Sequence, residues 1–111
     1  MHARVTRFQI LHGKIDEFAK AAESLLPLMR QQKGFCGVFV LQTHEADPIE
    51  VQVLSFWKTL EDLNASEKNL YFYQALARVQ AFAHGFPSIH VHHVLAGEFE
   101  QPFLERPHGA S

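Results

Sequence analysis

This sequence of 111 residues has a single cysteine, no long apolar run and no excess of basic residues. Its one cysteine, Cys36, cannot form an intrachain disulfide, and a chain of this length can bury a core that needs none. No apolar run approaches the roughly 20 residues of a membrane-spanning helix. We therefore expect a soluble, cytoplasmic protein that does not cross a membrane.

The charge balance excludes a further class of partner. Ten Lys and Arg face twelve Asp and Glu, which gives a formal net charge of -2, and the basic residues are scattered. Because nucleic-acid binding depends on a basic stripe that neutralises phosphates, we expect no nucleic-acid partner. The sequence also has no Gly-rich phosphate loop and no dinucleotide-binding fingerprint. Nucleotide and flavin binding thus have no support, and we expect no cofactor.

Hydrophobic spacing predicts one domain over residues 1–99 and an extended C-terminal tail over 100–111. Runs rich in β-branched and aromatic residues predict four strands, over 4–11, 35–43, 49–57 and 88–96. Between the first two strands, apolar residues recur at helical spacing, at Ile15, Phe18, Ala22, Leu25 and Met29. Pro27 predicts a kink or a break in this helix, and Gly34 a stop after it. A second helical region begins at the cap Thr59, breaks at 64–66, resumes near Glu67 and ends at 84–87.

The resulting order, βαββαβ, is typical of the α+β class. We expect a ferredoxin-like antiparallel sheet with both helices on one face. The strands are apolar on both faces, however: Val53 and Trp57 share one face of the third strand, while Leu54 and Phe56 share the other. Two helices can cover only one face, so we expect a homodimer through the second face. A hetero-partner or a domain outside this chain is the alternative.

Gly37, within the second strand, indicates a bulge or a close backbone approach.

Two motifs resemble the antibiotic biosynthesis monooxygenase family: Gly34-Phe35-x-Gly37 with Val38-Phe39-Val40-Leu41, and Val53-Leu54-Ser55-Phe56-Trp57-Lys58-Thr59. The similarity in order and spacing runs from about residue 4 to residue 99. It implies the fold of the dimeric α+β barrels. The family includes cofactor-free oxygenases of polycyclic aromatic intermediates, haem-degrading enzymes and small quinone-related oxygenases.

The resemblance carries over at some positions and not at others. Trp57 matches a Trp that lines the pocket of the cofactor-free oxygenases, and Arg78 is a counterpart of an Arg on their second helix if a one-residue shift is allowed. The Asn that those enzymes place four residues before the Trp is Val53 here. The stretch 66–76 contains neither the Trp nor the His of the haem-degrading branch, which disfavours that activity.

These matches, with the chemistry of nearby residues, predict a pocket between the helices and the sheet. Substrate binding is assigned to four residues, Trp57, Tyr71, Phe39 and Ser55. Catalysis is assigned to His92 as general base, with Arg78 and Trp57 holding the developing oxyanion. The alternatives are a core tryptophan at Trp57, and a half-buried Tyr71 beside a solvated Arg78.

His90 and His92 would share one face of the fourth strand, with His93 on the other. A third ligand could complete a zinc or iron site. The favoured interpretation is instead a mixed surface or interface strand without metal. Cys36 has no activating partner in the sequence and is interpreted as a small buried residue.

The leading hypothesis is therefore a cofactor-independent monooxygenase that acts on an aromatic or quinol-type small molecule. The first alternative is a non-catalytic dimer that binds a small ligand in the same pocket. The second is a metal-dependent variant that uses His90 and His92.

Overall fold

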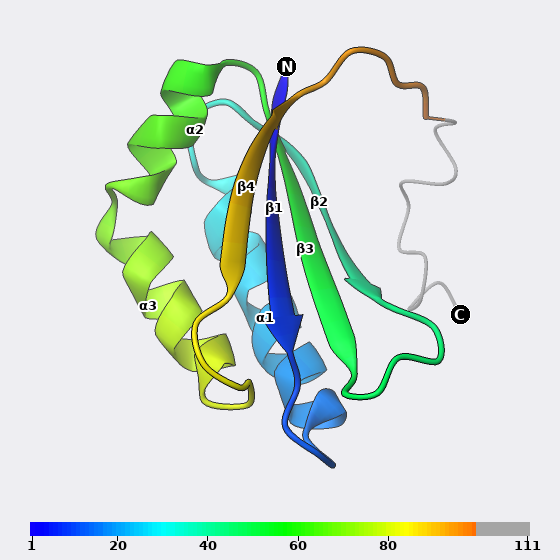
Figure 1. Ribbon diagram of the computed structural model, residues 1–111. Helices are drawn as coiled ribbons and strands as arrows, with labels where there is room; N and C mark the ends of the chain where they lie inside the picture. The colour runs from blue at the N-terminus through cyan, green and yellow to red at the C-terminus, as the bar shows by residue number, and fades with distance from the viewer. Residues whose placement is uncertain (100–111) are drawn as a thin grey trace, which may run out of the picture.

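The computed structural model of the protein describes residues 1–99 (Figure 1). One antiparallel sheet is made of β1 (His2–Gln9), β2 (Phe35–Gln42), β3 (Glu50–Trp57) and β4 (Ser88–His93), in the order β2-β3-β1-β4. The helices are α1 (Ile15–Arg30), α2 (Leu60–Glu67) and α3 (Leu70–Gln80). They lie on one side of the sheet (Figure 1). This arrangement confirms the predicted ferredoxin-like α+β fold. Within residues 1–99, no helix is both long and apolar enough to cross a membrane.

The register of β1 sorts the side chains of the sheet onto two faces. Arg4 lies opposite Ser55 of β3 and Val91 of β4, while Val5 lies opposite Leu54 and His90. Because successive side chains of a strand point to opposite faces, Arg4 and its partners share one face and Val5 and its partners share the other. We call the face that packs against the helices the inner face, and the opposite one the outer face.

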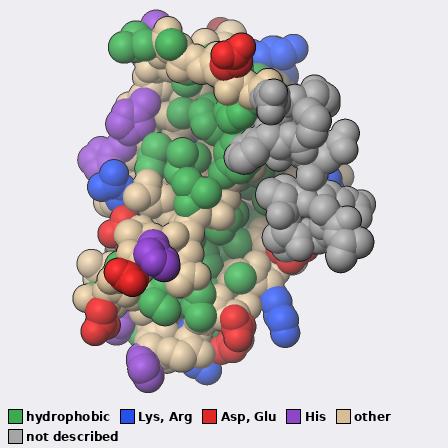
Figure 2. All heavy atoms as spheres, turned by 90° about the vertical axis from the view of Figure 1, so that its right-hand side faces the viewer, with side chains coloured by type: hydrophobic (Ala, Val, Ile, Leu, Met, Phe, Trp, Pro, Cys, Tyr) green, Lys and Arg blue, Asp and Glu red, His purple; other side chains and the backbone are tan. Residues whose placement is uncertain are grey.

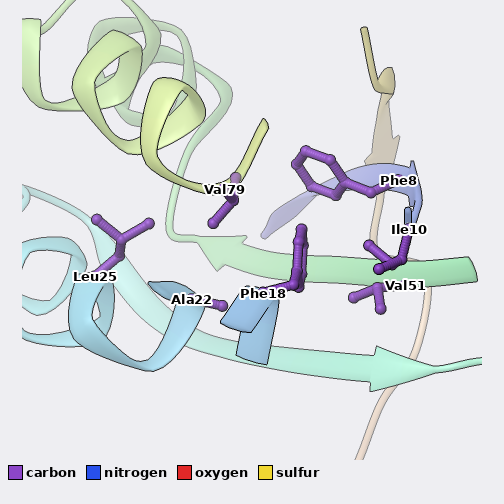
Figure 3. Close-up of a cluster of buried hydrophobic side chains, with 7 residues drawn as sticks. All are labelled: Phe8, Ile10, Phe18, Ala22, Leu25, Val51 and Val79. Carbon is purple, nitrogen blue, oxygen red and sulfur yellow. The ribbon is translucent and has the colours of Figure 1, made fainter. Parts of the chain in front are cut away.

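The core lies between the inner face, α1 and α3 (Figure 3). It consists of Phe8, Ile10, Phe18, Ala22, Leu25, Val51 and Val79. Phe18 is fully buried and meets Phe8 edge-on, with 5.1 Å between the ring centroids. The predicted apolar stripe of α1 faces the core, because four of its residues are buried: Phe18, Ala22, Leu25 and Met29.

The helices differ from the predictions at the junction of α2 and α3 and at the end of α3, which is Gln80 rather than 84–87. Of the kink or break expected at Pro27, the break does not occur, because α1 continues through Pro27 to Arg30. The second helical region does have two parts, but they meet at residues 68–69, later than expected. Asn69 has an extended backbone, and its carbonyl accepts a hydrogen bond from the N–H of Phe72, so it opens α3. Asn is a preferred residue at such a position. The predicted cap of α2 is confirmed, because Thr59 Oγ1 accepts a hydrogen bond from the N–H of Asp62 at 3.0 Å.

Both predicted glycine features are confirmed. Gly34 has φ of +80°, in the left-handed region that glycine favours, and its carbonyl accepts a hydrogen bond from Lys58. At Gly37 the pairing of β2 with β3 shifts by one residue relative to Phe35, which is a β-bulge. The tail predicted over residues 100–111 lies outside the described residues.

No helix covers the outer face of the sheet (Figure 1). Seen from that side in Figure 2, apolar side chains form a band with histidines beside it. The register places Val5, Phe39, Leu41, Leu54 and Phe56 on this face. The ring of Phe99 packs there at 5.8 Å from the ring of Phe39 and 6.3 Å from that of Phe56. The sheet is therefore apolar on both faces, as the strand patterns predict.

Gly34→Ala and Gly13→Ala form a matched pair that tests the turn after α1. Both glycines have positive φ, which costs an alanine about 1–3 kcal/mol. A Cβ at Gly13 would meet open space, whereas one at Gly34 would collide with the side chain of Asp62. In urea unfolding, we expect Gly34→Ala to lose about 1–3 kcal/mol more than Gly13→Ala. Equal losses would contradict the close approach of Asp62.

Candidate functional site

A cavity of about 70 Å³ lies between the inner face of the sheet, α1 and α3, where the pocket was expected. Its walls are mostly apolar, with contributions from Met29, Val38, Val53 and Leu76. The polar lining side chains are Arg4, Thr6, Ser55 and Tyr71. Val40 of β2 is the most exposed lining residue, at 39%, so the cavity opens to solvent beside this edge strand.

Arg4 is a buried cation in the wall of this cavity. It is only 4% exposed, and its guanidinium carbon lies 4.7 Å from the ring centroid of Phe72 and 5.5 Å from that of Trp57. Its Nη1 donates hydrogen bonds to Ser66 Oγ at 3.2 Å and to Glu67 Oε1 at 3.4 Å. Stacking on aromatic rings suits the planar, weakly hydrated guanidinium. Arg4 thus brings a positive charge to a wall that is otherwise uncharged within residues 1–99.

Trp57 lies behind the cavity rather than in its lining. Its side chain is fully buried, and its Nε1–H donates a hydrogen bond to Ser55 Oγ at 3.0 Å. Its ring packs edge-on against Phe35 and beside Arg4. Ser55 does line the cavity and is 1% exposed. Trp57 is therefore connected to the cavity wall by one hydrogen bond, to the hydroxyl group of Ser55.

Tyr71 lines the cavity from the first turn of α3. Its hydroxyl is buried and has no hydrogen-bond partner within the described part of the chain. A buried phenol without a partner is costly, because the group loses its hydrogen bonds to water. A ligand with an acceptor atom would supply the missing bond. Of the four side chains assigned to substrate binding, Tyr71 and Ser55 are the two that reach the cavity.

Three other predicted residues do not line this cavity. His92 pairs with Ala3, and Phe39 with Leu54, so both belong to the outer face. Arg78 is on α3 and is exposed. The structure therefore does not bring these side chains together in this cavity: the sheet separates His92 and Phe39 from the helices, and Arg78 is exposed.

The histidines of β4 divide between the faces as predicted. His90 and His92 lie on the outer face, and His93 lies on the inner face, where its ring stacks on that of His2 with 4.8 Å between centroids. Burial lowers the pKa of His2 below its usual value, and the nearby His93 and the N-terminal amino group lower it further. Within residues 1–99, no three His, Cys, Asp or Glu side chains are placed to share a metal ion.

Cys36 is exposed, so its interpretation as a buried residue is wrong. It is the extra residue of the bulge between Phe35 and Gly37 and has no partner across the ladder. Its thiol lies 3.5 Å from the carbonyl oxygen of Gly34. The bulge thus removes this side chain from the regular alternation of β2.

Sequence reasoning missed Arg4, although the sequence contains a signal for it. In the alternation of β1, Arg4 shares a face with Thr6, Phe8 and Ile10, all of which are buried. A charged residue at the inward position of a strand requires a partner. Here the partners come from the junction of α2 and α3, more than sixty residues away in the sequence, so local pattern analysis cannot supply them.

Residues 1–78 match the sequence profile of the family described as antibiotic biosynthesis monooxygenase. A search of curated proteins gives no match. Among solved structures, a protein named after the same family from Caulobacter crescentus aligns with a TM-score of 0.74 and 18% identity, over 86% of this chain and 90% of that one. A protein of unknown function from Nitrosomonas europaea aligns with a TM-score of 0.74 and 19% identity, over 89% and 93%. At these identities, the structural matches show a shared fold.

Ser55→Ala tests the link between Trp57 and the cavity wall. The substitution leaves the buried indole N–H without its acceptor, which should lower the free energy of unfolding by about 1–3 kcal/mol. Ser24→Ala is the control, because this hydroxyl is exposed and donates to the carbonyl of Ala21 in its own helix. We expect the control to stay within about 0.5 kcal/mol of the parent protein in denaturant unfolding. A Ser55→Ala protein as stable as the control would show that Trp57 does not depend on this bond.

Proposed function

This chain belongs to the antibiotic biosynthesis monooxygenase family, and we propose that it is a cofactor-independent monooxygenase of an aromatic or quinol-type small molecule. The observation that carries the proposal is the inner cavity: apolar walls for a ring, with buried polar groups for its oxygen substituents. Arg4, Tyr71 and Ser55 provide those groups.

The proposed reaction needs an electron-rich substrate and molecular oxygen. A phenol or enol loses a proton to water, the resulting carbanion transfers electrons to O2, and a carbon–oxygen bond forms. The outer oxygen of the peroxide then takes up a proton from water to give a hydroperoxide. Loss of water then converts an activated CH2 group to a carbonyl, so that one oxygen atom of O2 enters the product and the other leaves as water. The protein's contribution is to hold the anion: Arg4 supplies a positive charge, and Tyr71 a hydroxyl donor, in a site with little water.

The general base assigned to His92 has no support from its position on the outer face. Within residues 1–99, no His, Asp or Glu lines the cavity. This observation favours a second candidate function, a non-catalytic dimer that binds the same class of ligand. A catalytic protein would have to accept a substrate that ionises when it enters, under the influence of Arg4.

We also propose that the outer face is a homodimer interface. It carries Val5, Leu41, Leu54 and Phe56 without a covering helix, and Leu41 is 47% exposed. Exposed apolar patches of this kind mark association sites, and a two-fold contact between identical faces is the simplest way to bury one. His90 and His92 would then lie beside that interface.

Oxygen consumption tests the proposed activity. With a panel of hydroquinones, we expect turnover above the rate in buffer. Tyr71→Phe should lower kcat/KM about tenfold, the loss of one hydrogen bond in a buried site. Arg78→Ala is the control and should retain activity, because Arg78 is exposed and does not line the cavity. Ligand binding without turnover would instead establish the non-catalytic alternative.

Sedimentation equilibrium tests the dimer. We expect a mass of twice 12.7 kDa at micromolar concentration. Leu54→Glu places a charge in the centre of the outer face and should give monomers. The matched control is Leu70→Glu, because Leu70 is an exposed leucine at the start of α3, at 70% exposure. A parent protein that sediments as a monomer, or equal effects of the two substitutions, would refute the interface.

A further inference from the structure

We infer that the inner cavity selects a ligand with one ring and one anionic oxygen group, a carboxylate or a phenolate, and that Arg4 is the residue that binds this group. The inference deepens the proposed function, since it rests on the inner cavity being the ligand site. It does not require that the ligand be oxidised.

The guanidinium of Arg4 is buried and is held by two hydrogen bonds and two aromatic rings. Phe72 and Trp57 pack near it at 4.7 and 5.5 Å, and the side chain is 4% exposed. The Nη1 atom makes both of its protein hydrogen bonds, to Ser66 and Glu67. The N–H groups on Nε and Nη2 donate to no group within residues 1–99. The N–H groups on Nε and Nη2 of a guanidinium can donate together to the two oxygens of a carboxylate.

The charge of Arg4 is only partly compensated by the protein. Its one carboxylate partner is Glu67, at 3.4 Å, and the Glu67 side chain is 32% exposed and therefore solvated. Arg4 is also the one charged residue among those that line the cavity within the described chain. A buried charge is costly unless it is paired. An anion in the cavity would complete the pairing, whereas a neutral ligand of the same shape would not.

Tyr71 adds a second polar contact in the same cavity. Its buried hydroxyl can donate to an oxygen of the ligand, and no protein group within residues 1–99 competes for it. The walls between these polar groups are apolar and include Val53 and Leu76. The arrangement suits a planar apolar body with polar substituents at its edge.

The size of the cavity limits the ring system. Its volume of about 70 Å³ is below the roughly 150 Å³ of an engineered cavity that binds benzene. A single ring would therefore extend toward the opening beside Val40, and a fused polycyclic body would not be enclosed. We accordingly assign a monocyclic acid or phenol as the ligand class.

Calorimetric titration with benzoate and with benzamide, its neutral counterpart of nearly the same shape, tests the inference. The parent protein should bind benzoate at least roughly tenfold more tightly than benzamide, the usual effect of a hydrogen bond to a charged group. Arg4→Met should abolish this preference while leaving benzamide binding within about twofold of the parent. Arg7→Met is the matched control, because Arg7 is on the same strand but is exposed on the outer face; both affinities should be unchanged.

Glu67→Gln gives an independent reading if Arg4→Met fails to fold. It removes the competing carboxylate but keeps a hydrogen-bond acceptor for Arg4, so benzoate should bind several-fold more tightly. A purely structural Arg4 would show no such gain. Benzoate bound no better than benzamide, no binding of either probe, or no gain in Glu67→Gln overturns the inference. Benzoate selectivity without oxygen consumption supports it and defeats only the oxygenase proposal.

Discussion

The pairing register of β1 with its two neighbours decides on which face of the sheet the candidate functional residues of these strands lie. β1 is one of the two central strands, so its alternation sets the alternation of β3 on one side and β4 on the other. A one-residue slip would exchange the two faces. In the observed register, Arg4 and Ser55 meet the helices, while Leu54 and His92 are on the far side. The same register thus places the cavity on one face of the sheet and the proposed dimer interface on the other.

Arg4 connects this sheet to the helices that enclose the cavity. It bonds Ser66 and Glu67 at the end of α2 and packs against Phe72 in the first turn of α3. The break between the two helices therefore lies over a buried cation. Because the same guanidinium also lines the cavity, a ligand that pairs with it would act on the α2–α3 junction as well. Binding of such a ligand would thus be coupled to local stability through this one side chain.

The sequence predicts the fold well because the strand and helix patterns are local. The βαββαβ order, the stripe of α1 and the turn at Gly34 follow from spacing and turn chemistry alone. The site is less predictable, because the face of the sheet on which a strand residue such as His92 lies depends on its register with distant strands. Family resemblance placed Trp57 in the lining, whereas its N–H is bonded to Ser55 behind the wall. Arg4 escaped notice because its partners are distant in the sequence.

The central claim is that the inner cavity, and not the histidine-bearing outer face, is the ligand site. Side-chain NMR of nitrogen-15-labelled protein during a benzoate titration tests it most directly. The account predicts that the Nε–H resonance of Arg4 shifts and exchanges more slowly with water, while the ring resonances of His90 and His92 stay in place. Shifts confined to His90, His92 and Phe39, with Arg4 unchanged, would contradict it.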